Sequence, residues 1–146
     1  MKRLPKIVLL SLIFACIGIT TEVVFTSLTK VYNNYFAHGI IDWALGGKTY
    51  LWMFFIYMII PLLFKTFHPF VEKYSIFIRA LIAVFFVYVI EFSTGLILEL
   101  TTGVCPWKYT TGWHIMGYIR IDYFPFWYVF ALIIINVYQT LDKRLH

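Results

Sequence analysis

Charged side chains are scarce in this chain. Asp, Glu, Lys and Arg make up 13% of its 146 residues, whereas hydrophobic residues make up 62%. A soluble domain normally carries about a quarter charged residues. The composition therefore excludes an ordinary soluble domain and is typical of an integral membrane protein whose surface faces lipid.

The sequence also lacks the short motifs of several common chemistries. It has no Gly-x-x-x-x-Gly-Lys-Ser/Thr phosphate loop, which excludes ATP hydrolysis through such a loop. It also has no Gly-x-Ser-x-Gly nucleophile elbow, which excludes hydrolase chemistry built on that motif. The four histidines are scattered without ligand spacing: His38, His68, His114 and His146. We therefore predict no catalytic residue, no metal or haem site and no other cofactor.

Cysteine is equally rare. Cys16 lies in the first apolar stretch and Cys105 in a later loop, and neither belongs to a Cys-x-x-Cys pair, so we predict no disulfide between them and infer no compartment from them. Cys105 with His114 is a conceivable nucleophile and base, but a lone cysteine beside an aromatic loop is more often structural.

Long apolar runs take the place of these features. A helix needs about 20 apolar residues to cross a hydrocarbon core of roughly 30 Å. Four stretches fit this length: Leu4–Thr29, Tyr50–Phe67, Ile76–Leu98 and Tyr123–Leu141. We predict an all-α polytopic membrane protein with four transmembrane helices in a single domain, residues 1–146.

Basic residues indicate the orientation of these helices. Of the twelve Lys and Arg residues, eight lie next to helix ends on the same side of the membrane as the two chain termini. Lys and Arg are enriched in cytoplasmic loops. The first apolar run continues to Phe25 without a small-x-small cleavage site, which favours a retained helix over a signal peptide. We predict cytoplasmic termini in the cytoplasmic membrane of a bacterium, with the lipid bilayer and not nucleic acid as partner.

The two halves of the chain resemble each other. Residues 4–67 and 76–141 each contain a first helix that carries a glutamate, an aromatic outer loop with glycine, and an aromatic-rich second helix. Because odd-numbered helices run in the same direction, the sequence predicts two parallel helical-hairpin repeats.

Glu22 and Glu91 occupy matching places in these halves. Each lies 15 residues into its apolar helix, after Ile7 and Ile76, or about 22 Å above the inner boundary. Small and polar residues share their helical faces, which indicates helix contacts. These faces contain Gly18, Glu22, Thr26 and Thr29 in the first helix and Tyr88, Glu91, Gly95 and Glu99 in the third.

Two interpretations of the glutamates stay open. If the carboxylates face each other in a low-dielectric core, they would share a proton or bind a cation. Alternatively, each hydrogen-bonds a neighbouring backbone or hydroxyl group, such as Thr21 or Ser93, and fixes helix packing.

The outer loop from Glu99 to Asp122 is long and aromatic. Its Trp and Tyr residues are typical of a belt at the headgroup level, or they cap the outer mouth of the bundle above the glutamates. Arg120 has three candidate partners, namely Asp122, Glu99 and an anionic headgroup. Arg79 is predicted to reach cytoplasmic phosphates.

Four motifs in order resemble a known family. They are Glu22-Val-Val-Phe-Thr, the stretch Thr49–Tyr57, Glu91-Phe-Ser-Thr-Gly and Cys105-Pro-Trp-Lys-Tyr. Together they cover nearly the whole chain, which resembles the putative ABC-transporter type IV (CmpB-like) family, including transmembrane protein 229 of animals. The resemblance implies transport, with any ATPase on another polypeptide. The chain departs from the family pattern at three positions. Phe55 stands where the family often has proline, Lys108 where it usually has an acidic residue, and Glu99 where a basic residue is common.

These observations predict an outward-facing acidic and aromatic pocket that binds a small cationic or amphipathic ligand, or a lipid. Its predicted lining is Glu22, Glu91, Trp52, Tyr57, Trp107 and Tyr109, with Glu99, Arg120 and Asp122 setting the charge of the outer loop. A single bundle leaves little room for a pathway, so we expect a homodimer or a partner membrane subunit. Two alternatives are an accessory subunit of a membrane complex and an embedded enzyme acting on lipid headgroups through Glu91 and His114.

Overall fold

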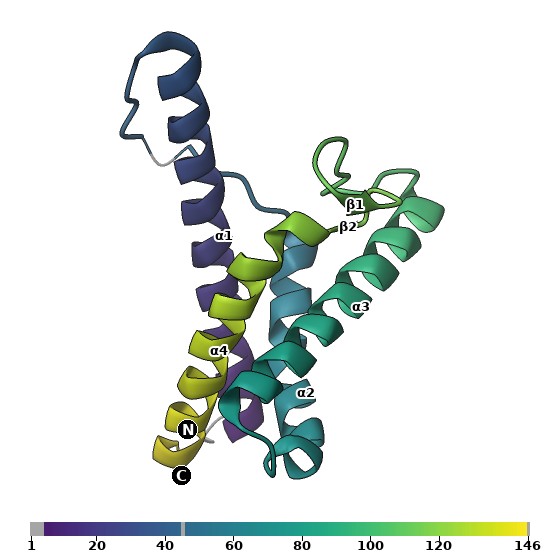
Figure 1. Ribbon diagram of the computed structural model, residues 1–146. Coiled ribbons are helices and arrows are strands. Elements are labelled where there is room, and N and C mark those ends of the chain that lie inside the picture. Colours follow the sequence, from purple (N-terminus) through teal and green to yellow (C-terminus); the bar gives the residue numbers. More distant parts are fainter. Residues whose placement is uncertain (1–4, 45, 146) are drawn as a thin grey trace. The chain divides into compact units, whose positions relative to one another are not determined.

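The computed structural model describes residues 5–44 and 46–145 (Figure 1). Within them the chain forms α1 (Lys6–His38), α2 (Leu51–Val71), α3 (Ile76–Thr102), strands β1 (His114–Ile115) and β2 (Ile119–Arg120), the 3-10 helix η1 (Ile121–Tyr123) and α4 (Phe124–Arg144). Each of the four long helices is long and apolar enough to cross a membrane. The four predicted helices are confirmed, and each has the length and apolarity of a span. Leu4, where the first predicted span begins, lies outside the described residues, as do Lys2 and Arg3, two of the eight basic residues on the side of the termini.

The helices extend beyond the predicted apolar runs. The sequence predicts an end at Thr29 for the first helix, but α1 continues to His38, and Gly39 caps it with a left-handed φ of 67°. The residues between are mostly polar or aromatic and include no Pro or Gly, so backbone hydrogen bonding continues after the apolar run has ended. The apolar run therefore predicts the part of the helix that suits lipid, whereas the end of the helix is set by Gly39, which permits the chain to turn.

The chain divides into two compact units, one up to Phe67 with the residues from Arg144, and one of His68–Lys143. In the first unit α1 and α2 run in opposite directions, and residues 39–44 and 46–50 return along the C-terminal part of α1 (Figure 1). The rings of Phe14 and Phe64 meet edge to face, with centroids 6.3 Å apart. This pairs the beginning of α1 with the last part of α2.

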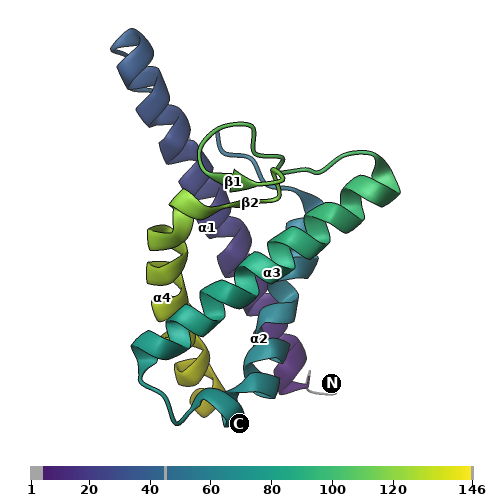
Figure 2. The ribbon, with the colours of Figure 1, turned by 45° about the vertical axis from the view of Figure 1, so that its right-hand side comes forward.

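In the second unit α3 and α4 are joined by residues 103–123, which fold back beside the C-terminal half of α3 (Figure 2). Their core is an antiparallel hairpin that pairs His114 with Arg120 and Ile115 with Ile119. Met116 and Gly117 form its turn with φ of 51° and 76°, the positive values that a tight hairpin turn requires. The loop is therefore folded and not an extended connector.

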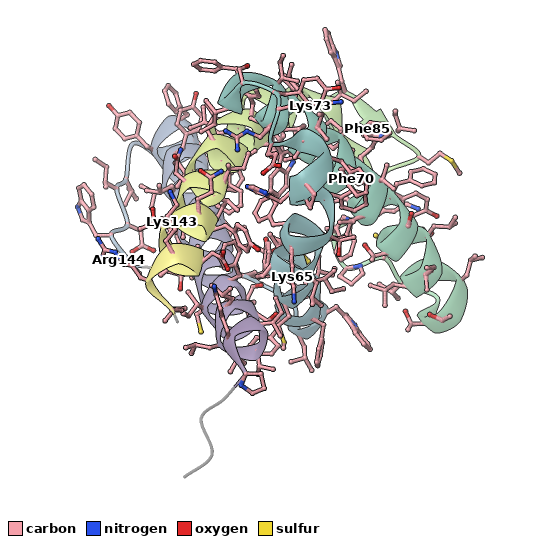
Figure 3. The ribbon with its side chains drawn as sticks, turned by 90° about the horizontal axis from the view of Figure 1, so that it is seen from below. Lys65, Phe70, Lys73, Phe85, Lys143 and Arg144 are labelled. Atoms are coloured by element: carbon pink, nitrogen blue, oxygen red, sulfur yellow. The ribbon has the colours of Figure 1, made fainter. Side chains whose placement is uncertain are left out.

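Basic side chains mark one end of each unit. Figure 3 labels Lys65 on α2, and in the second unit Lys73 before α3 and Lys143 on the last turn of α4. The segment before α3 and the last turn of α4 lie at the opposite end of that unit from the hairpin (Figures 1 and 2). This is the distribution from which the sequence predicts a cytoplasmic side, and the orientation stays a prediction.

Candidate functional site

Glu22 is held by hydroxyl groups in the first unit. Its Oε2 accepts a hydrogen bond of 2.8 Å from Thr49 Oγ1, just before α2, and lies 3.5 Å from the hydroxyl of Tyr57 on α2. The ring of Tyr57 is buried and occupies the space where Gly18 has no side chain. The absence of a side chain at residue 18 thus lets the tyrosine lie beside α1 and reach the carboxylate.

One turn further along α1, Thr26 fixes the segment that precedes α2. Thr26 Oγ1 accepts a 2.9 Å hydrogen bond from the backbone N–H of Lys48 and donates to the carbonyl of Glu22 at 2.8 Å. Gly47 lies so close to α1 that a Cβ there would collide with the carbonyl oxygen of Val23. This contact brings Thr49 to the level of Glu22.

The contacts confirm the predicted face of α1 for Gly18, Glu22 and Thr26, which all meet α2 or the segment before it. Thr29 is exposed and donates to the carbonyl of Phe25 instead. The hydroxyl partners of Glu22 are Thr49 and Tyr57, whereas Thr21 is exposed. A carboxylate among hydroxyl and carbonyl oxygens offers ligands suited to a proton or a hard cation.

Trp52 does not share this arrangement. It is 47% exposed and lies five residues before Tyr57 in α2, which at 100° per residue places it about 140° around the helix from the tyrosine. Tyr57 and Trp52 therefore lie on different faces of α2. Of the predicted pocket residues, the first unit joins Glu22 and Tyr57.

In the second unit the outer loop packs on α3 through Tyr118. Its buried ring meets Phe92 edge to face at 5.3 Å and lies against Gly95. The indole N–H of Trp107 donates to the carbonyl of Tyr118 at 3.2 Å. Gly95 leaves room for these groups and for the sulfur of Cys105. Trp107 thus stabilises the loop one turn beyond Glu91.

Glu99 and Lys108 form an ion pair that fastens the same loop to the last turn of α3. The Lys108 ammonium also lies 4.2 Å from the centroid of the Tyr118 ring, a cation–π contact. Its hydrogen bond to Glu99 raises the pKa of Lys108, so the amine stays cationic at neutral pH. Glu99 and Lys108, the two charges at which the resemblance predicts the opposite sign, are therefore partners. Reversing the charge of both residues would preserve the ion pair.

Exchanging the two charges tests this coupling. We expect Glu99→Lys alone and Lys108→Glu alone to lower the thermal stability of the second unit, because each puts two like charges side by side. The double variant should recover most of the loss, although the effect is modest because both side chains are partly exposed. Thermal unfolding of the purified protein in detergent measures it, and additive losses in the double variant would contradict the pairing.

Arg120 is paired with Asp122, one of its three predicted partners. Nε and Nη2 of Arg120 both donate to this carboxylate at 2.9 Å, and Nη1 donates to the Tyr123 hydroxyl at 3.0 Å. Tyr109 meets the Tyr123 ring edge to face at 6.0 Å. The guanidinium lies against Gly112. Arg120, Asp122 and Tyr109 thus join the loop to the beginning of α4.

The remaining predicted groups are placed as follows. Glu91 is half-buried on α3, one turn before Gly95, and belongs to a different unit from Glu22. Burial raises the pKa of the Cys105 thiol, which disfavours the nucleophilic thiolate, and His114 is exposed at the start of β1. Within residues 5–44 and 46–145, no three His, Cys, Asp or Glu side chains come together as a metal site.

Comparison with known proteins agrees with the four motifs. The family model described as putative ABC-transporter type IV matches residues 9–146. No solved structure matches the chain significantly. The predicted resemblance is thereby confirmed over nearly the full sequence.

Proposed function

Because this chain belongs to the putative ABC-transporter type IV family and is an integral membrane protein with four spanning helices, we propose that it binds and helps to transport a small cationic or amphipathic ligand, or a lipid. The observation that carries this proposal is Glu22, a carboxylate inside a predominantly apolar helix with hydroxyl groups around it. Ionisable groups within membrane spans are costly and mark ligand or ion pathways.

In this proposal Glu22 is the charged anchor, and it takes a proton when the ligand leaves. Thr49 and Tyr57 orient the ionised carboxylate by donating to Oε2. Glu91 is the second acidic group of the pathway, and Trp52, Trp107 and Tyr109 supply ring faces for a cation. A homodimer or a partner subunit completes the pathway, with both termini on the cytoplasmic side of a bacterial membrane.

Replacement of the anchor tests the proposal. In vesicles loaded with choline or ethidium as cationic probes, we expect Glu22→Gln to reduce probe flux about tenfold or more and to remove its dependence on pH, because the amide can neither ionise nor exchange a proton. Glu72→Gln is the matched control, since Glu72 is an exposed carboxylate that pairs with His68. Unchanged flux and pH dependence in the Glu22 variant would overturn the proposal.

An accessory subunit is the second candidate, favoured by the hydrogen bond that joins Glu22 to Thr49 within one hairpin. In that case Glu22→Gln lowers the midpoint of thermal unfolding in detergent and leaves no probe-specific defect. Glutamine keeps a carbonyl acceptor for Thr49, so a purely structural role predicts a small loss. Stability and flux measured on the same preparation therefore separate the two functions.

A further inference from the structure

One face of α4 is exposed in a regular pattern. Phe126, Val129, Ile133, Asn136 and Thr140 recur at intervals of three, four, three and four residues and are all exposed, with Val129 and Ile133 more than half accessible. The opposite face is buried through Ala131, Ile134, Ile135 and Tyr138. Such alternating spacing forms a narrow seam along a helix, of the kind through which two helices pack.

Asn136 makes this seam more than a lipid-facing surface. It lies 12 residues after Phe124 and 8 before Arg144, or about 18 Å and 12 Å along the helix, so its amide lies inside the hydrocarbon core. Its Nδ2 donates to the Leu132 carbonyl at 2.8 Å. Among the described residues no other partner engages this amide, which leaves Oδ1 and one N–H unsatisfied, a costly state in lipid.

We propose that this seam of α4 is a self-association surface, in which Asn136 hydrogen-bonds Asn136 of a second copy. Two copies in one membrane share the same orientation, so a two-fold axis along the membrane normal brings their seams together with both asparagines at the same depth. An amide is both donor and acceptor, which makes it complementary to itself. The seam between Phe126 and Thr140 contains no charge that the second copy would repel.

On the other described helices, the one exposed amide is that of Asn33, which lies within two turns of the end of α1 and not in mid-span. On α3, the accessible residues Phe77, Leu81, Phe85 and Val89 are apolar and equally suited to lipid, and the exposed Ser93 is a hydroxyl. On α1, the exposed Thr20 is a hydroxyl, which can bond to its own helix backbone. An amide in the middle of a span instead favours a partner helix.

Association of the full-length protein in vesicles tests the proposal. The fraction of dimers is measured by single-molecule photobleaching while lipid dilutes the protein. We expect Asn136→Leu to weaken dimerisation about tenfold, as one or two interhelical hydrogen bonds would, and Asn136→Gln to restore much of it. Thr20→Val on α1 is the matched loss of a polar group and should leave the dimer unchanged.

Cross-linking gives an independent readout. In a background carrying Cys16→Ser and Cys105→Ala, Ile133→Cys should form a disulfide-linked dimer on mild oxidation. Phe85→Cys, on the exposed face of α3 (Figure 3), should stay monomeric. A wild-type protein that is monomeric at every dilution, equal dimerisation by the Asn136→Leu variant, or cross-linking from Phe85→Cys alone would each overturn the inference, as would association only with a different membrane protein.

Discussion

Alanine in place of Gly47 is expected to separate the segment before α2 from α1. The added Cβ would collide with the carbonyl oxygen of Val23 and would lie 2.6 Å from Oγ of Ser27. The carbonyl belongs to a helix backbone and has little freedom to move, so the segment must shift instead. The shift removes the hydrogen bond from Lys48 to Thr26 and takes Thr49 away from Glu22.

The expected loss is about 3 kcal/mol of unfolding free energy, from overpacking and two broken hydrogen bonds together. Reversible unfolding by SDS in mixed micelles measures it. Because the displaced segment carries a partner of Glu22, cation flux in vesicles should fall in the same variant. One substitution thus links the packing of a loop to the carboxylate that we propose as the anchor.

Gly46 provides the matched control. It is the adjacent residue, and a Cβ there would meet only the end of the flexible Lys30 side chain, at 2.9 Å from Nζ. Gly46→Ala should therefore change stability and flux little. Equal behaviour of the two variants would show that close approach to α1 is not what Gly47 provides.

The four spans are predictable because their cause is local. Each apolar run is long enough by itself to cross the bilayer, and no tertiary contact is needed to recognise it. The end of α1 cannot be predicted from the apolar run, because backbone hydrogen bonding continues through polar residues up to Gly39. Hydropathy reports the preference for lipid, and that preference ends at about Thr29, nine residues before the helix does.

The candidate site is predictable only in part. The period of the helix places Gly18, Glu22 and Thr26 on one face, and this prediction is confirmed by the contacts of α1. The partner Thr49 is 27 residues from Glu22, and its position depends on the path by which residues 46–48 pack along α1. No local pattern in the sequence determines that path, so sequence reasoning did not assign Thr49 to the carboxylate.

The outer loop shows the same division. Its aromatic content indicates a folded element, but single residues have several possible neighbours until the hairpin turn at Gly117 fixes the register. Arg120 then meets Asp122, and Glu99 pairs with Lys108. Arg120 and Asp122 are opposite charges two residues apart, so their pairing was one of three predicted options. Glu99 and Lys108 join a helix end to a loop, and no sequence pattern indicates that they pair.

Leucine in place of Gly18 is expected to break the contact between α1 and α2. The ring of Tyr57 lies where a side chain would project from Gly18, and both residues are buried. The tyrosine would have to leave, which also withdraws its hydroxyl from Glu22. We expect a loss of about 3 kcal/mol in the SDS titration, because a large side chain inserted into a tight helix contact overpacks it.

Two further variants identify the cause of that loss. Thr20→Leu places the same side chain on the exposed face of α1 and should leave stability nearly unchanged. Tyr57→Ala removes the ring, so the double variant Gly18→Leu with Tyr57→Ala should lose less than the sum of the single variants, which is the signature of two residues that occupy the same space. If the losses of the two single variants added up in the double variant, Gly18 would not be needed to make room for the Tyr57 ring. With the ring gone and the new leucine filling its place, any remaining defect in cation flux isolates what the Tyr57 hydroxyl does for the Glu22 carboxylate.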